Sequence, residues 1–82
     1  MNISSAIVKG SDILNRSGID QPRREASSLL AFALGKDDVY LIAHPEYELD
    51  AAETAAFDEI IHRRASREPF HYIVGRKEFF GL

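Results

Sequence analysis

The chain has 82 residues, which is room for one domain with a modest core. A hydrophobic content of 45% excludes disorder on composition, and a net charge of −3 argues against wrapping a phosphate backbone. The lack of cysteine excludes disulfides and thiolate metal sites, and the apolar runs are far shorter than the roughly 20 residues that cross a bilayer. We therefore expect a cytoplasmic monomer that contacts neither membrane nor nucleic acid directly.

A first helix is predicted over residues 3–16, where apolar residues recur at helical spacing. Gly18 follows it and suits the left-handed residue that ends many helices. Gly10 lies inside the segment, where glycine weakens a helix by about 1 kcal/mol relative to alanine. Either a close contact with another helix or a soft spot accounts for Gly10.

A second helix is predicted from Pro22 to Gly35. Asp20 is the expected cap for its first N–H groups, and Pro22 suits the first turn because it has no N–H to lose. The expected buried stripe follows the i, i+3, i+4, i+7, i+8 pattern of a helix packed on a core. Its residues are Ala26, Leu29, Leu30, Ala33 and Leu34.

Two further helices follow. A short one begins at Asp37 or Asp38 and is stopped by Pro45. Asp50 caps the next, with Glu53 three residues later as in a capping box. The expected buried face of that helix consists of Ala56, Phe57, Ile60 and Ile61.

A fifth short helix is predicted from Pro69 through Ile73, closed by Gly75. After it, residues 76–82 read RKEFFGL, which is more typical of an incoming strand than of a helix. We therefore expect an all-α fold, a small bundle of about five short helices over residues 1–75. We expect residues 76–82 to form an extended tail that leads to a region outside this chain.

No motif in the sequence assigns a catalytic, cofactor-binding or metal-binding residue. His44, His62 and His71 lack metal-ligand spacing, no GxSxG surrounds a serine, and the glycines are too far apart to cradle a nucleotide. We therefore expect no cofactor and no metal in this chain.

Arginines are the candidate binding residues. Arg23 and Arg24 occupy the first turn of the second helix, where the helix dipole disfavours cations. They either pair with an acid such as Glu25, or one from the fourth helix, or contact a partner. Further arginines gather after His62, following a stretch of eight acidic residues without Lys or Arg, and form an edge that we expect to be exposed. A solvated helix end and a partner-facing edge both remain open for them.

Two stretches resemble one known family. The run RRASREPFHYIVGRKEFFGL over residues 63–82 resembles the junction between the N-terminal helical domain and the catalytic domain of HemK/PrmC-type protein-(glutamine-N5) methyltransferases. The run PRREASSLL over residues 22–30 resembles the second-helix signature of the same N-terminal domain, in the right order and at a fitting distance. The chain contains neither the family's glycine-rich donor motif nor an Asn-Pro.

The resemblance implies a parent enzyme that uses S-adenosylmethionine to methylate the glutamine in the Gly-Gly-Gln motif of peptide-chain release factors. It implies that residues 1–75 are the substrate-recognition domain, that the catalytic domain lies beyond residue 82, and that this chain alone is inactive. The implied partners are a release factor and the parent's own C-terminal catalytic domain. Because arginine is favoured at interfaces, we take the following as candidate partner-binding residues: Arg23, Arg24, Arg63, Arg64 and Arg67.

Other functions remain open on the sequence. The chain fits a free-standing helical interaction module, or the same domain of the sister enzyme that methylates a glutamine of a ribosomal protein. A helix-turn-helix DNA-binding domain is disfavoured by the acidic balance and by the lack of a basic recognition helix. A small all-helical enzyme acting alone would need charged groups that converge in one pocket.

Overall fold

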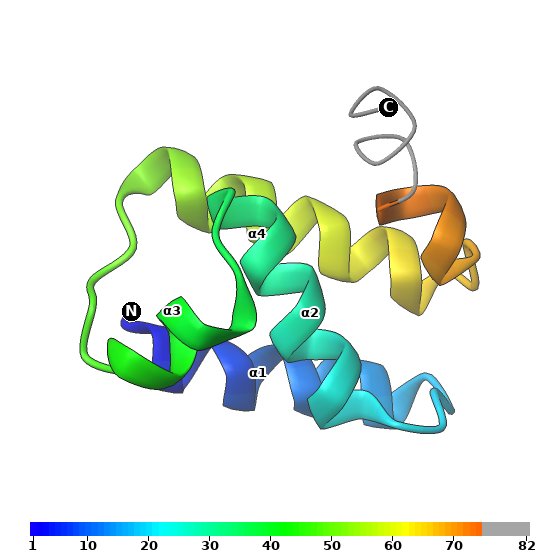
Figure 1. Cartoon of the computed structure of the whole chain (residues 1–82). Helices are drawn as coiled ribbons and strands as arrows, with labels where there is room; N and C mark the ends of the chain where they lie inside the picture. The colour runs from blue at the N-terminus through cyan, green and yellow to red at the C-terminus, as the bar shows by residue number, and fades with distance from the viewer. Residues whose placement is uncertain (75–82) are drawn as a thin grey trace.

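The helices predicted from the sequence are present in the computed structural model, which describes residues 1–74 (Figure 1). They are α1 (Ile3–Arg16), α2 (Pro22–Leu34), α3 (Asp38–Ala43) and α4 (Ala51–Ala65), followed by a helical turn at residues 70–74. Within residues 1–74 no strand forms, and the one β-type pairing is an isolated bridge between Asn2 and Glu48. The all-α prediction is confirmed. The predicted stop at Gly75 and the predicted extended tail at residues 76–82 lie outside the described residues.

The three long helices form two layers, with α1 and α4 in one layer and α2 in the other (Figure 1). In Figure 1, α1 and α4 run in the same general direction and α2 crosses between them, so that α2 packs against both. The short helix α3 packs on α2. The turn at residues 70–74 follows the end of α4 and lies far from the N-terminus (Figure 1). The side of α2 that faces away from α1 and α4, which we call its outer side, is therefore bordered by α3 and by residues 70–74.

The start of α1 is held by the loop before α4. Asn2 caps α1 through its side chain. The N–H groups of Ile3 and Ser4 donate to the carbonyls of Tyr47 and Pro45, each at 3.0 Å. The first N–H groups of a helix have no partner within the helix, and here a loop more than forty residues away supplies them.

Capping was predicted correctly for α4 but not for α2. Asp50 and Glu53 form the full capping box, with the Glu53 N–H donating to Asp50 Oδ1 at 2.7 Å. At α2 the cap position is Gln21, which makes no side-chain hydrogen bond, so the prediction of Asp20 as the cap is wrong. Asp20 lies one residue too early, because the first helical turn starts from the Gln21 carbonyl, which accepts from the Glu25 N–H at 3.0 Å.

Three helices end in a left-handed residue. Gly18 after α1 has a φ of 81° and Gly35 after α2 has a φ of 69°. After α4 the same position is Arg67, with a φ of 76°. There the N–H groups of Arg67 and Glu68 donate back to α4, which is the Schellman arrangement that satisfies the last carbonyls of a helix.

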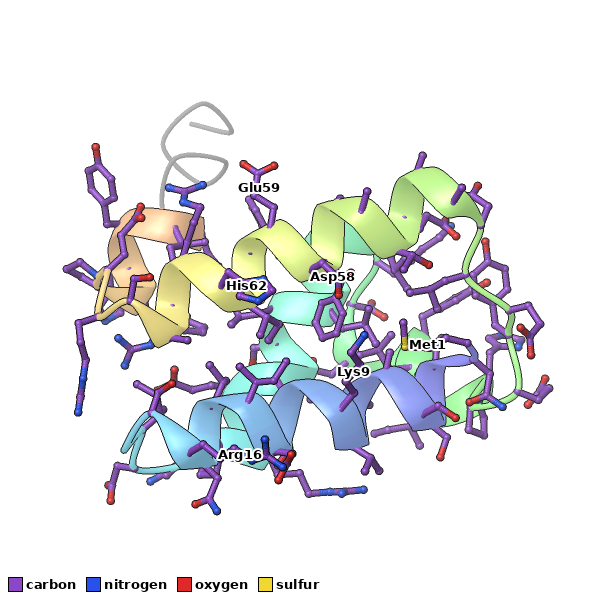
Figure 2. All side chains as sticks on the ribbon, turned by 180° about the vertical axis from the view of Figure 1, so that it is seen from behind. Met1, Lys9, Arg16, Asp58, Glu59 and His62 are labelled. Atoms are coloured by element: carbon purple, nitrogen blue, oxygen red, sulfur yellow. The ribbon has the colours of Figure 1, made fainter. Side chains whose placement is uncertain are left out.

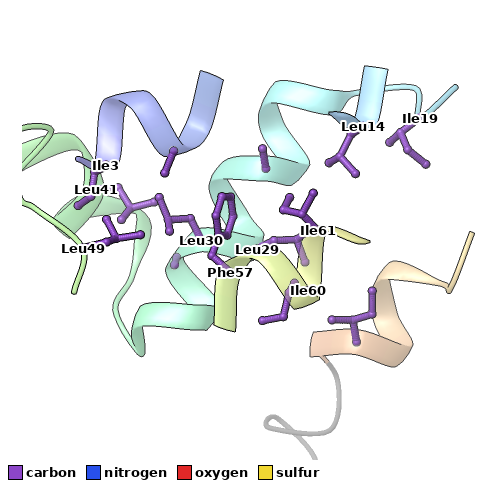
Figure 3. Close-up of a cluster of buried hydrophobic side chains, with 14 residues drawn as sticks. Ile3, Leu14, Ile19, Leu29, Leu30, Leu41, Leu49, Phe57, Ile60 and Ile61 are labelled. Carbon is purple, nitrogen blue, oxygen red and sulfur yellow. The ribbon is translucent and has the colours of Figure 1, made fainter. Parts of the chain in front are cut away.

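The core lies where α1, α2 and α4 meet (Figure 3). Gly10 of α1 allows this close approach, because a Cβ built on it would lie 2.9 Å from Phe57 Cζ and 3.0 Å from Ile61 Cδ1. A helix contact, rather than a soft spot, therefore accounts for Gly10. Most of the predicted core is buried, although Ala33, Leu34 and Ala56 are only half-buried. The buried hydrophobic residues are Ile3, Ala6, Leu14, Ile19, Ala26, Leu29, Leu30, Ala31, Leu41, Leu49, Phe57, Ile60, Ile61 and Ile73.

Candidate functional site

Three adjoining hollows lie along the outer side of α2, and Ser28 lines all of them. The arginine hollow, between α2 and α3, is lined by Arg23, Arg24, Ser27, Ser28, Asp38 and Ile42. The ion-pair hollow, toward the end of α4, is lined by Gln21, Arg24, Glu25, Ser28, Arg64, Pro69, Phe70 and His71. The apolar hollow, toward the other end of α2, is lined by Ser28, Ala31, Phe32, Lys36, Asp37, Asp38, Phe70 and Val74. We call the three together the α2 face.

An ion pair between two helices lines the ion-pair hollow. Arg64 of α4 donates to both carboxylate oxygens of Glu25 of α2, from Nε at 2.6 Å and from Nη2 at 3.3 Å. Its Nη1 donates to the Glu68 carbonyl at 3.1 Å. Both side chains of the pair are largely buried, with 18% and 22% of their surface exposed. The hydrogen bond to Glu25 raises the pKa of Arg64 above its ordinary value. The two contacts with Glu25 hold this guanidinium within the fold.

Arg63 is also paired. Its Nε donates to both carboxylate oxygens of Glu68 at 3.1 Å, and its Nη2 contacts the same carboxylate. This hydrogen bonding raises the pKa of Arg63. The expectation of an exposed arginine edge is therefore wrong for Arg63 and Arg64, which are half-buried and each paired with a glutamate.

Arg67 remains exposed and takes the left-handed conformation after α4. Its guanidinium lies against the turn after α1, since a Cβ built on Gly18 would come within 2.9 Å of Arg67 Nη2. Left-handed backbone costs roughly 1 to 2 kcal/mol for a residue other than glycine. The structure thus keeps a strained, cationic residue where glycine serves at the two equivalent helix ends.

Arg23 and Arg24 are exposed at the start of α2 and make no ion pair with any residue in 1–74. The alternative in which they pair with Glu25 or with an acid of the fourth helix is therefore wrong. Glu25 precedes the buried Leu29 by one helical turn and so shares the side of α2 that α4 covers, where Arg64 reaches it. The two arginines both line the arginine hollow, and Arg24 also borders the ion-pair hollow beside Glu25.

The candidate set therefore separates into two groups. Arg63 and Arg64 are held by glutamates, whereas Arg23, Arg24 and Arg67 present exposed charges. Sequence reasoning missed the other residues that line the α2 face, most notably Ser28, Ile42 and Phe70. The spacing of Arg24 and Ser28, four residues apart on one helix, was the available signal for Ser28.

The opposite surface, formed by α1 and α4, has a different character (Figure 2). There Arg16 pairs with Asp12 at 2.9 Å, and Lys9 Nζ lies 4.0 Å from Asp58. His62 contacts the Asp58 carbonyl through Nδ1 at 2.8 Å. Charges of both signs offset each other on this side, as is usual for solvated helices. The described chain gathers no group of His, Cys, Asp or Glu that could hold a metal ion, and none of its helices could cross a bilayer.

Comparison with known proteins gives one consistent result. The family described as the PrmC N-terminal domain matches residues 5–75. No solved structure matches the chain.

Relatives match the chain over almost its whole length. It is 41% identical over 81 residues to a release factor glutamine methyltransferase of Koribacter versatilis, covering 99% of this chain and 29% of the relative. It is 35% identical over 82 residues to one of Caulobacter vibrioides, covering 100% of this chain and 28% of the relative. A bifunctional methyltransferase of Rickettsia felis is 37% identical over 79 residues, covering 96% of this chain and 15% of the relative.

The chain thus spans less than a third of the length of these relatives. The match over residues 5–75 includes α2 with its arginine pair and the Glu68-Pro69 turn that carried the resemblance in the sequence. The predicted family is confirmed: this chain belongs to the family of PrmC N-terminal domains.

Proposed function

We propose that this chain is the substrate-binding domain of an S-adenosylmethionine-dependent methyltransferase that acts on the Gly-Gly-Gln glutamine of a peptide-chain release factor. In this proposal the cofactor and the catalytic residues belong to the parent's catalytic domain, and residues 1–74 hold the release factor. The proposed location is the cytoplasm, where release factors meet ribosomes. Family membership and the names of two relatives support the substrate class.

The α2 face is the proposed contact surface. It combines concave shape, apolar side chains and exposed arginines, whereas the α1–α4 surface offers mutually paired charges. Arginine is enriched at protein interfaces and lysine and glutamate are depleted there. The observation that carries the assignment is the exposure of Arg23 and Arg24 beside three adjoining hollows. Arg67, exposed after α4, extends the proposed contact.

A separate docking surface has a physical reason. One glutamine side chain buries little area, whereas stable protein interfaces bury about 1,200 to 2,000 Å² in total. A domain that holds the release factor elsewhere raises the effective concentration of its loop at a catalytic site. It also fixes the orientation of the reacting amide.

Isothermal titration calorimetry of the 82-residue chain against the release factor of the same organism tests the proposal. We expect saturable binding with one partner per chain. The ribosomal protein that the sister enzyme methylates serves as the matched competitor. A chain that binds this ribosomal protein and not the release factor contradicts the proposed substrate, and a chain that binds neither contradicts the docking role.

A further inference from the structure

The arginine hollow carries charge that the described chain leaves unpaired. Arg23 and Arg24 line it, and no carboxylate in residues 1–74 lies within ion-pair distance of either. Both occupy the first turn of α2, whose start has no side-chain cap. The free N–H groups there also favour a negative charge. Two guanidinium groups and a helix start therefore favour an anionic partner at the same place.

The same hollow has an apolar side. Ile42 of α3 lines it with 80% of its surface exposed, and Val39, one turn earlier on α3, is 71% exposed. Exposed aliphatic residues one helical turn apart lie on the same side of the helix. A small anion would leave both uncovered, whereas a protein segment covers them and the arginines together.

Asp38 makes the two sides of the arginine hollow opposite in charge. It lines the α3 side, opposite the arginines of α2. A carboxylate is therefore attracted at the start of α2 and repelled beside α3. A nucleic-acid backbone carries phosphates at regular intervals and no aliphatic side chain, so it fits neither Asp38 nor Ile42. The net charge of −3 opposes such a polyanion further.

We propose that the arginine hollow docks an acidic protein segment whose carboxylates pair with Arg23 and Arg24 and whose neighbouring aliphatic side chain packs on Ile42. The identity of the segment as part of a release factor rests on the proposed function. The chemistry of the segment rests on the hollow alone. Arginine and carboxylate form bidentate pairs, which fix the register of the segment as well as hold it.

Affinity measurements on single variants test the hollow with the release factor as probe. We expect Arg23→Ser, Arg24→Ser and Ile42→Ser each to weaken binding by about tenfold, the scale for losing one contact at a desolvated interface. Asp38→Asn should strengthen binding, because it removes a repelling charge. Arg16→Ser is the matched control, since it removes an exposed arginine from the α1 surface (Figure 2), and it should leave the affinity unchanged.

The salt dependence of binding and a second, acidic probe distinguish failure of the arginine hollow from failure of the proposed function. Added salt should lower the affinity of the wild-type chain for the release factor more than it lowers the affinity of the Arg23→Ser/Arg24→Ser double variant. If the release factor binds all variants with the same affinity, docking at the arginine hollow is contradicted and the proposed function is unaffected. A release factor that fails to bind overturns the proposed function, and the ¹⁵N-labelled chain is then titrated with a random copolymer of glutamate and leucine. Shifts confined to the arginine hollow support the inference, whereas their absence, or stronger shifts there with a short DNA duplex, overturns it.

Discussion

The guanidinium of Arg64 and the carboxylate of Glu25 join α4 to α2, although 39 residues separate them in the chain. This contact neutralises one cation within the α2 face and holds α4 against the helix that carries Arg23 and Arg24. The exposed arginines of the face are therefore those that the fold has not paired.

Removing the carboxylate of Glu25 should destabilise the fold. We expect Glu25→Gln to lower the free energy of unfolding by about 1 to 3 kcal/mol, because Arg64 stays largely buried without its charged partner. Urea unfolding measures the change. Asp12→Asn, which breaks the exposed pair with Arg16, should change stability by less than about 1 kcal/mol. Equal losses in the two variants would show that the Glu25 pair is an ordinary surface pair.

Adding one methyl group at Gly10 should also destabilise the chain. Alanine improves helix propensity by about 1 kcal/mol, but its Cβ would lie 2.9 Å from Phe57 Cζ in a closed core. Overpacking costs about 1 to 3 kcal/mol, so we expect Gly10→Ala to lower the thermal midpoint. Combining it with Phe57→Leu should cost less than the sum of the two single changes. A higher midpoint for Gly10→Ala alone would contradict the close packing of α1 on α4.

The left-handed backbone at Arg67 should lower the stability of the chain. Replacing it with glycine removes the strain of a left-handed residue, so we expect Arg67→Gly to stabilise the chain by about 1 kcal/mol. Arg67→Ala keeps the strain and removes the guanidinium from the Gly18 turn, and should not stabilise. Thermal unfolding of both variants decides the matter. A loss of stability in Arg67→Gly would show that the contact with Gly18 outweighs the strain.

Tyr47 should ionise at unusually high pH. The hydrogen bond that its hydroxyl donates to Glu53 raises the pKa of Tyr47 above its ordinary value of 10.0, with burial and the Glu53 charge acting in the same direction. The folded state therefore holds the phenol proton more tightly than the unfolded state. The resulting stabilisation is fully present below pH 10.0 and is lost as pH rises toward the folded-state pKa.

Ultraviolet titration of the phenolate, with Tyr47→Phe to identify its signal, measures this pKa. Glu53→Gln is the comparison variant, because glutamine preserves the capping box and removes the negative charge. It should move the Tyr47 pKa back toward 10.0. A pKa that does not differ between wild type and Glu53→Gln would contradict the assigned cause.

Local signals predicted most of the helices, because each helix depends on nearby residues. Pro22, Gly18, Gly35 and the Asp50–Glu53 box act within one turn of the chain, and the structure follows them. At α1 the side chain of Asn2 is also a local signal, since asparagine is a preferred N-cap, and the sequence-based prediction missed it. The bonds from the N–H groups of Ile3 and Ser4 to the distant carbonyls of Tyr47 and Pro45 depend on tertiary structure and have no local signal.

The candidate site was predicted only in part for the same reason. Local spacing places Arg23 and Arg24 at the start of a helix but does not show which arginine reaches Glu25. That choice depends on how α4 crosses α2. The hollows likewise form between α2, α3 and residues 69–74, so Ile42 and Phe70 enter the site only through tertiary packing.

The central claim is that the α2 face receives the release factor. The most direct test is to record amide chemical shifts of the ¹⁵N-labelled chain while unlabelled release factor is added. The account predicts that the perturbed amides cluster at the start of α2, in α3 and at residues 69–74. It predicts that those around Lys9, Arg16 and Asp58 on the opposite surface stay unchanged (Figure 2). Perturbations that cluster on the α1–α4 surface and spare the α2 face would contradict it.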